Sequence, residues 1–283
     1  MKEECFEFAL KTTFSLFVIN KKGKIGKISF HALIGKLIAS SGIFLLKKET
    51  DMSKRNKLKA TIDDGFQPEL VKKARFEGIF EIPVIDKPKR IFIPSGITPF
   101  SRRNEAPTDS EAIGFFEMDP MFADVLRNPQ AYVEELKKFP AVISPDCSLY
   151  RDAPLTVQIA NIYKKNAISR YWHSQGVNVF ALVRWGSRDT YTTDVLPEPI
   201  AFAGIPHNSI IVVSTYGCSM SKADKYHFEA GFAECMRILT PRIVLVHGAM
   251  PKKIFEPYLK YADFHHYPDW ISRKKGGDDG WWK

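Results

Sequence analysis

The chain has few cysteines and none of the cysteine patterns that bind zinc or build a disulfide framework. Its 283 residues include only Cys5, Cys147, Cys218 and Cys235. No two of them form a Cys-x-x-Cys pair, and no histidine pair accompanies them at zinc-finger spacing. Scattered cysteines in a chain of this length indicate reduced thiols and predict a cytoplasmic protein.

Several familiar signatures of chemistry are also absent. The sequence has no P-loop, no Gly-x-Gly-x-x-Gly turn after a strand and no His-Glu-x-x-His motif. These absences exclude the commonest nucleotide-binding and zinc-hydrolase signatures. A site must therefore be inferred from the order of the predicted elements.

The chain has no long apolar run that is free of charge. The longest, ISFHALIGKLIASSGIFLL at 28–46, is long enough to span a bilayer but contains His31 and Lys36. A central lysine costs about 3 kcal/mol on insertion scales. Three interpretations of residues 1–51 stay open: an extension before a true start at Met52, a membrane or interface helix, or a packed helical hairpin. No membrane contact is expected for the rest of the chain.

Positive charge exceeds negative charge. Lysine and arginine number 41 against 32 acidic residues, a formal net charge of +9. Residues 1–51 contribute +4 of this excess. A basic balance favours anionic partners such as nucleotides or nucleic acid, and the alternative is a soluble protein with scattered lysines.

Strands and helices alternate in the second part of the chain. Residues 52–112 are predicted as a lead-in, with a β-hairpin at 79–94 around the turn Asp86–Lys89 and a loop at 95–111. Six apolar strands begin near 113, 141, 177, 209, 242 and 263. Helices are predicted between them, at 119–139 (interrupted near Asn128–Pro129), 155–175, 221–241 and 251–262. Residues 269–283 are predicted as a flexible tail.

Apolar strands that alternate with helices predict an α/β fold of repeated βα units, with a mainly parallel sheet covered on both faces. This core spans 113–268. Six units are fewer than the eight of a complete barrel, so the sheet is expected to be either a partial TIM-barrel-like structure or an open twisted sheet.

Ligands bind at the carboxyl ends of the strands in both architectures. The residues at those ends therefore form the candidate site. The candidate catalytic residues are Asp119, Asp146, Arg184 and His247. The candidate substrate-binding residues are Ser144, Ser148, Tyr150, Arg151, Trp185, Ser214, Thr215, Tyr216 and Gly217.

Each of these residues also has a structural interpretation. Asp146 could serve only to cap the helix that begins at Pro154. Arg184 could serve only to form an ion pair with Asp146 or Asp119. His247 precedes a glycine, as a turn histidine does. Because consecutive parallel strands usually pair, Asp146 and Arg184 are predicted to lie on adjacent strands.

An ordered set of motifs resembles one known family. FFEMD, SPDCSLYRDAPLTVQIANIY, VRWG, AGIPHNSIIVVSTYGC and VLVHG occur in this order. Together they are similar to domain-of-unknown-function family 4417, over roughly 76–268. The resemblance implies an occurrence in phages and mobile elements, and implies no reaction. The family pattern has a tyrosine where this chain has His247, and an acid where it has Ala203.

Two functional hypotheses follow. The first is an enzyme that acts on phosphoryl or glycosyl bonds of a nucleotide or nucleic acid. Arg184 would clamp a phosphate, and Asp119 and Asp146 would hold Mg²⁺ or divide acid and base roles. The second is a binding module without catalysis, for nucleic acid or for a partner protein of a mobile element. Trp172, Trp270, Trp281 and Trp282 would offer stacking surfaces to bases.

Overall fold

The computed structural model describes residues 15–19, 25–29, 66–218 and 221–276. The chain divides into two compact units, 1–61 and 62–283. In the first, β1 (Ser15–Ile19) and β2 (Ile25–Ser29) pair antiparallel. Most of the apolar run at 28–46 lies outside the described residues, so the three interpretations of 1–51 stay predictions. In the described part of the chain, no helix combines the length and the apolar character needed to cross a bilayer.

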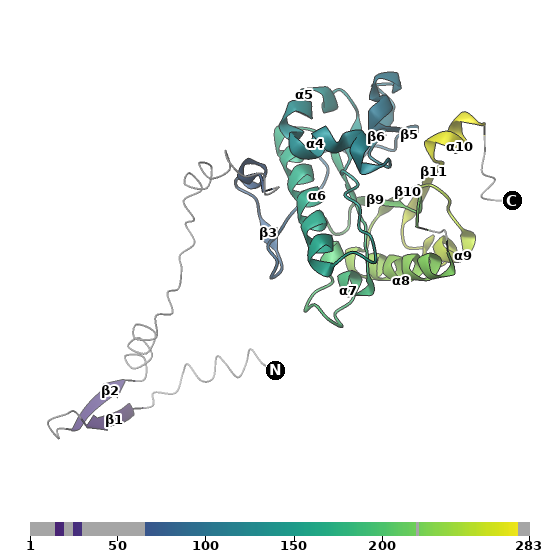
Figure 1. The fold of residues 1–283 in the computed structure, drawn as a ribbon. Coiled ribbons are helices and arrows are strands. Elements are labelled where there is room, and N and C mark those ends of the chain that lie inside the picture. Colours follow the sequence, from purple (N-terminus) through teal and green to yellow (C-terminus); the bar gives the residue numbers. More distant parts are fainter. Residues whose placement is uncertain (1–14, 20–24, 30–65, 219–220, 277–283) are drawn as a thin grey trace. The chain divides into compact units, whose positions relative to one another are not determined.

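The second unit is built on one seven-stranded sheet (Figure 1). Its strands lie side by side in chain order, and every neighbouring pair is parallel. They are β5 (Gly96–Pro99), β6 (Glu111–Gly114), β7 (Ala141–Ile143), β8 (Val179–Leu182), β9 (Ile210–Ser214), β10 (Ile243–His247) and β11 (Asp263–Tyr267). The predicted parallel sheet is confirmed. Its first strand, β5, was missed, because 95–111 was predicted as a loop.

The sheet curls into a partial barrel. All seven strands contribute to one buried cluster on its inner face, which comprises Ile97, Ala112, Ala141, Ile143, Phe180, Leu182, Ile210, Val212, Leu245 and Tyr267. The two edges of the sheet are linked through the last residue of β11 and the segment that follows it. There the Tyr267 hydroxyl donates to the Pro94 carbonyl oxygen at 2.8 Å, and Arg273 of α10 (Trp270–Lys274) contacts Gly96 and pairs with Glu111. A helix therefore occupies part of the predicted flexible tail.

Two long helices lie on the outer face of the sheet (Figure 1). The first, α6 (Leu155–Gln175), ends at Gly176, whose φ of 104° stops the helix as predicted. The second, α8 (Lys222–Leu239), begins with the predicted capping box between Ser221 and Asp224. On α6, Trp172 is fully buried and its Nε1 donates to the Pro129 carbonyl at 2.9 Å. Its predicted role as an exposed stacking surface is wrong, because the helix turns this face to the core.

The other helices are short. They are α4 (Ala123–Arg127), α5 (Val133–Leu136), α7 (Arg188–Tyr191) and α9 (Lys252–Phe255), with 3-10 turns η1 (Pro68–Val71), η2 (Phe100–Glu105), η3 (Asp119–Phe122), η4 (Pro129–Tyr132), η5 (Ile200–Phe202) and η6 (Glu256–Tyr258). The predicted helix at 119–139 is thus divided into four short helical segments, η3, α4, η4 and α5. The predicted break at Asn128–Pro129 is confirmed. Proline cannot donate the backbone hydrogen bond that a continuous helix needs there.

The N-terminal hairpin of this unit is shorter and earlier than predicted. β3 (Phe76–Glu77) pairs antiparallel with β4 (Ile82–Pro83). Gly78 and Glu81 turn the chain between them with positive φ values of 71° and 51°. The predicted turn at 86–89 is instead part of a segment without regular structure, which leads from β4 to β5.

Candidate functional site

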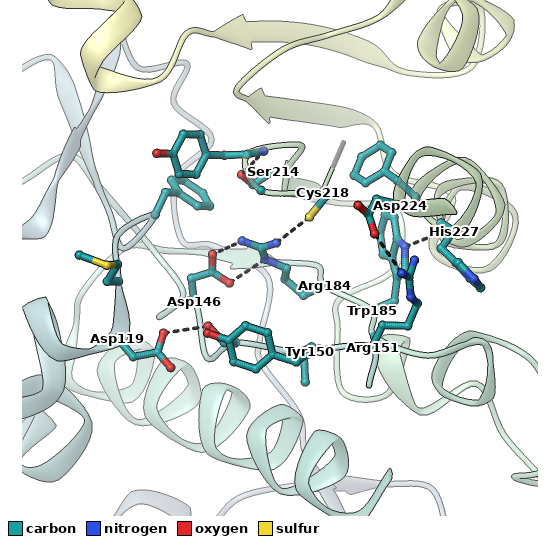
Figure 2. A pocket seen from close by; sticks show the side chains of 18 of the residues that line it. Asp119, Asp146, Tyr150, Arg151, Arg184, Trp185, Ser214, Cys218, Asp224 and His227 are labelled. Carbon is teal, nitrogen blue, oxygen red and sulfur yellow. Dashed lines mark hydrogen bonds and ion pairs between the residues drawn. The ribbon is translucent and has the colours of Figure 1, made fainter. Parts of the chain in front are cut away.

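A cleft of about 770 Å³ opens at the carboxyl ends of the strands (Figure 2). Its walls come from the segments that follow β6, β7, β8 and β9, and from the first turns of α8. This is the rim at which the sequence predicted a site. Ten of the thirteen predicted residues line it: Asp119, Asp146, Ser148, Tyr150, Arg151, Arg184, Trp185, Ser214, Tyr216 and Gly217.

Asp146 and Arg184 form a bidentate ion pair at the centre of the cleft (Figure 2). They follow the paired strands β7 and β8, so the prediction that they lie on adjacent strands is confirmed. Arg184 Nε donates to Asp146 Oδ1 at 2.7 Å, and Nη2 donates to Oδ2. Burial works against the guanidinium charge, but the carboxylate outweighs it and raises the pKa of Arg184.

The remaining nitrogen of Arg184 meets a thiol. Nη1 donates to Cys218 Sγ at 3.0 Å (Figure 2). Sulfur is a weak acceptor, so this corner of the guanidinium is held less firmly than the two that face Asp146. The pairing of Arg184 with Asp146, which the sequence left open, is therefore present, and it leaves Nη1 without a carboxylate partner.

Asp119 and Arg151 stand on opposite sides of Tyr150 (Figure 2). Ser148 Oγ donates to Asp119 Oδ1 at 2.8 Å and orients that carboxylate. Arg151 lies 3.1 Å from Asp224 Oδ1, the same aspartate whose other oxygen caps α8. Hydrogen bonds from Ser221 lower the pKa of Asp224, with a further contribution from Arg151.

His247 does not line the cleft. Its ring is buried, stacks on Phe116 with ring centres 4.0 Å apart, and has Nδ1 3.2 Å from Ser214 Oγ. Burial lowers the pKa of His247 to about 3, with a smaller contribution from the charge of Arg184, so the imidazole is neutral at physiological pH. A neutral histidine shut off from the cleft is poorly suited to the catalytic role predicted for it.

Two predicted hydroxyl residues are also buried outside the cleft. Ser144 Oγ donates to the Phe180 carbonyl, and Thr215 Oγ1 donates to the carbonyl of Ala249. Both satisfy backbone acceptors next to strands. They stabilise the ends of β7 and β9 rather than present donors to a ligand.

Sequence reasoning missed several residues of the cleft, among them Glu117, Asp152, Cys218, Asp224 and His227. Glu117, Asp152 and Cys218 stand at the same strand ends as the predicted residues but were not selected as candidates. Asp224 and His227 belong to α8, where no strand-end rule applies.

With these residues added, the cleft holds five carboxylates and two arginines. Within the described residues, no group of three or more His, Cys, Asp and Glu side chains is placed to hold a metal ion.

Seven parallel strands in chain order, curled around their own core and with a cleft at their carboxyl ends, define a partial-barrel α/β protein. The chain belongs to the family described as Domain of unknown function (DUF4417), whose profile matches residues 74–267. This confirms the resemblance seen in the strand-end motifs.

Two relatives come from phages. The chain is 28% identical over 212 residues to the Gene 1 protein of Mycobacterium phage D29, which covers 71% of this chain and 72% of the relative. It is 28% identical over 174 residues to the Gene 1 protein of Mycobacterium phage L5, covering 60% and 72%. These relatives support the predicted phage association. No solved structure shows a significant match to the chain.

Proposed function

We propose that the cleft binds a nucleotide, or the end of a nucleic-acid strand, through its phosphates and acts on a phosphoryl or glycosyl bond. The observation that carries this proposal is the unequal pairing of Arg184. Two of its nitrogens are held by Asp146, and Nη1 has only the thiol of Cys218. A phosphate oxygen is a far better acceptor than a thiol, so it can replace Cys218 without breaking the ion pair.

The size and the aromatic side chains of the cleft suit such a ligand. A volume of about 770 Å³ lies within the range of roughly 300–1,000 Å³ that is usual for small-molecule sites. Tyr150 is 65% exposed, and Tyr216 is also exposed. Exposed tyrosine rings provide flat surfaces on which a base can stack.

The charge of the cleft points to a metal-bound phosphate. Five carboxylates against two arginines repel a free phosphate. Mg²⁺ commonly binds through one or two carboxylates together with the phosphates of the substrate, and keeps several waters. We assign this role to Asp119, which Ser148 orients. Binding should therefore depend on the divalent cation.

A titration of nucleoside mono-, di- and triphosphates, with Mg²⁺ or with EDTA, tests the proposal. We expect at least one nucleotide to raise the melting temperature and bind in calorimetry only when Mg²⁺ is present. Asp119→Asn should abolish this Mg²⁺-dependent binding. Asp124→Asn, the same change at an exposed residue of α4, is its matched control and should leave binding intact.

The stacking surface needs its own pair of variants. Tyr150→Ala should weaken nucleotide binding by roughly tenfold, the scale of one lost stacking contact. Tyr261→Ala removes a tyrosine that is 66% exposed and does not line the cleft, so it should have no effect. The proposal fails if no nucleotide binds under any of these conditions.

The second candidate is a binding module without catalysis. It is favoured by the mutual pairing of Asp146 and Arg184, which leaves neither free as an acid or base at the centre of the cleft. Turnover separates the two candidates. An enzyme converts the bound nucleotide and loses this activity in Asp119→Asn, whereas a binding module leaves the nucleotide unchanged in the wild type.

A further inference from the structure

The positive charge of the chain is not located in the cleft, whose lining is acidic. Among the described residues, one group of cations without an ion pair lies on the segment between β4 and β5. Within it, Lys87, Lys89 and Arg90 are exposed, and they are followed by the apolar residues 91–93. We call residues 87–93 the amino-end strip.

Hydrogen bonds fix the backbone of the strip to the core. The side chain of Asn178 accepts from Arg90 N at 3.3 Å and donates to Arg90 O at 3.0 Å, and it also donates to Pro140 O at 2.8 Å. Pro140 and Asn178 directly precede β7 and β8. The strip therefore crosses the amino ends of these strands, whereas the cleft lies at their carboxyl ends.

The cations of the strip are not neutralised. The nearest acid in sequence, Asp86, forms an ion pair with Arg75, in which Asp86 Oδ1 lies 2.6 Å from Arg75 Nη2. Across the described residues, no ion pair involves Lys87, Lys89 or Arg90. The charges of Lys89 and Arg170 both act on the buried His173, which places a fourth cation near the strip. Such a concentration of charge is costly unless an anion lies over it.

Apolar surface adjoins these charges. The guanidinium of Arg90 lies over the ring of Phe92 at 5.6 Å. Ile91 and Ile93 are 54% and 37% exposed. A rigid line of cations beside exposed apolar side chains fits a strand of nucleic acid, whose phosphates meet the charges while its sugars and bases cover the apolar atoms.

We propose that the amino-end strip binds the backbone of a single-stranded nucleic acid, without sequence preference and independently of the cleft. Lys87, Lys89 and Arg90 contact successive phosphates. Because binding releases counterions from the phosphates, the affinity falls as the salt concentration rises. The surface lies within the part of the chain that matches the family.

Fluorescence anisotropy with a labelled 20-nucleotide strand tests this proposal on the full chain. The variant carries Lys87→Glu, Lys89→Glu and Arg90→Glu. Its matched control carries Lys252→Glu, Lys253→Glu and Lys260→Glu, an equal change of charge at exposed residues in which Lys260 also lies over an aromatic ring, that of Tyr261. Circular dichroism checks that all proteins are folded. A milder variant with glutamine at 87, 89 and 90 covers the case in which the glutamates prevent folding.

We expect the glutamate variant to bind at least tenfold more weakly at low salt, and the glutamine variant to be intermediate. The slope of log K against log salt should flatten by about 2, since each lost phosphate contact removes roughly 0.7. The control should bind as the wild type does, and the loss of affinity in the strip variants should be the same with Mg²⁺ and with EDTA, which separates this surface from the Mg²⁺-dependent cleft. The proposal is overturned if the wild type does not bind, if strip and control variants weaken equally, or if binding is seen only to vesicles of phosphatidylserine.

Discussion

The ring of Phe116 stacks on the imidazole of His247, with ring planes 11° from parallel. Phe116 follows β6, and His247 ends β10, four strands further along the sheet. Two such side chains meet only because the sheet curls. Phe116 also packs against the inner-face cluster, so the stacked pair covers the barrel core beneath the cleft. The same contact buries His247 and keeps it neutral.

Replacement of His247 by phenylalanine should keep the stacking and remove a titrating group. The folded-state pKa of about 3 lies below the unfolded value of about 6.5, so the unfolded state takes up the proton first as the pH falls. Between pH 8 and pH 5, the free energy of unfolding of the wild type should therefore fall by about 2 kcal/mol relative to that of His247→Phe. Urea unfolding at both pH values measures this, and parallel losses in the two proteins would contradict it.

The ion pair between Asp146 and Arg184 should matter greatly for stability. Arg184→Met leaves a buried carboxylate without a partner, and should lower the free energy of unfolding by about 3–5 kcal/mol. Arg184→Met combined with Asp146→Leu should be less damaging than the sum of the two single variants. The exposed pair Arg188 and Asp194 is the control, and Arg188→Met should change stability little. Additive effects at Asp146 and Arg184 would rule out the coupling.

Lys165 is buried in α6, and its Nζ donates to the Leu182 carbonyl at 2.7 Å. Burial lowers the pKa of this lysine to about 8, from an unfolded value of about 10.4. Between these values the unfolded state holds more protons, so the stability of the wild type should rise as the pH increases from 8 to 10.

Lys165→Met lacks this titration. Between pH 8 and pH 10, the free energy of unfolding of the wild type should rise by about 2 kcal/mol relative to that of Lys165→Met, as measured by urea unfolding. Lys164→Met, at the neighbouring half-buried lysine, controls for the general effect of alkaline pH. The interpretation is wrong if the two variants show the same pH dependence.

The cysteines should differ sharply in reactivity. Cys147 and Cys235 are buried, and burial raises the pKa of the Cys147 thiol to about 12. Cys218 is partly exposed, lines the cleft and contacts Arg184. In a Cys5→Ser background, iodoacetamide should alkylate Cys218 first. A nucleotide that occupies Arg184 should slow this labelling, as peptide mass spectrometry can show; equal labelling of all three thiols would contradict the structure.

The sequence alone determined the features that follow from local periodicity and chain order. Apolar strands alternating with helices specified the parallel sheet, Ser221 and Gly176 marked helix ends, and consecutive strands brought Asp146 beside Arg184. These features depend on hydrogen bonding and burial within a few tens of residues. A single sequence is sufficient for them because each element carries its own pattern.

Only the tertiary structure decided the rest. The four residues of β5, with a glycine and a proline, carry no strand pattern, and they form a strand because β6 offers a parallel edge. The curl of the sheet determined that His247 is stacked and buried instead of lining the cleft. It also brought α8, with Asp224 and His227, to the rim of the cleft. Curvature and helix placement arise from the packing of all seven strands at once, so no short stretch of sequence encodes them.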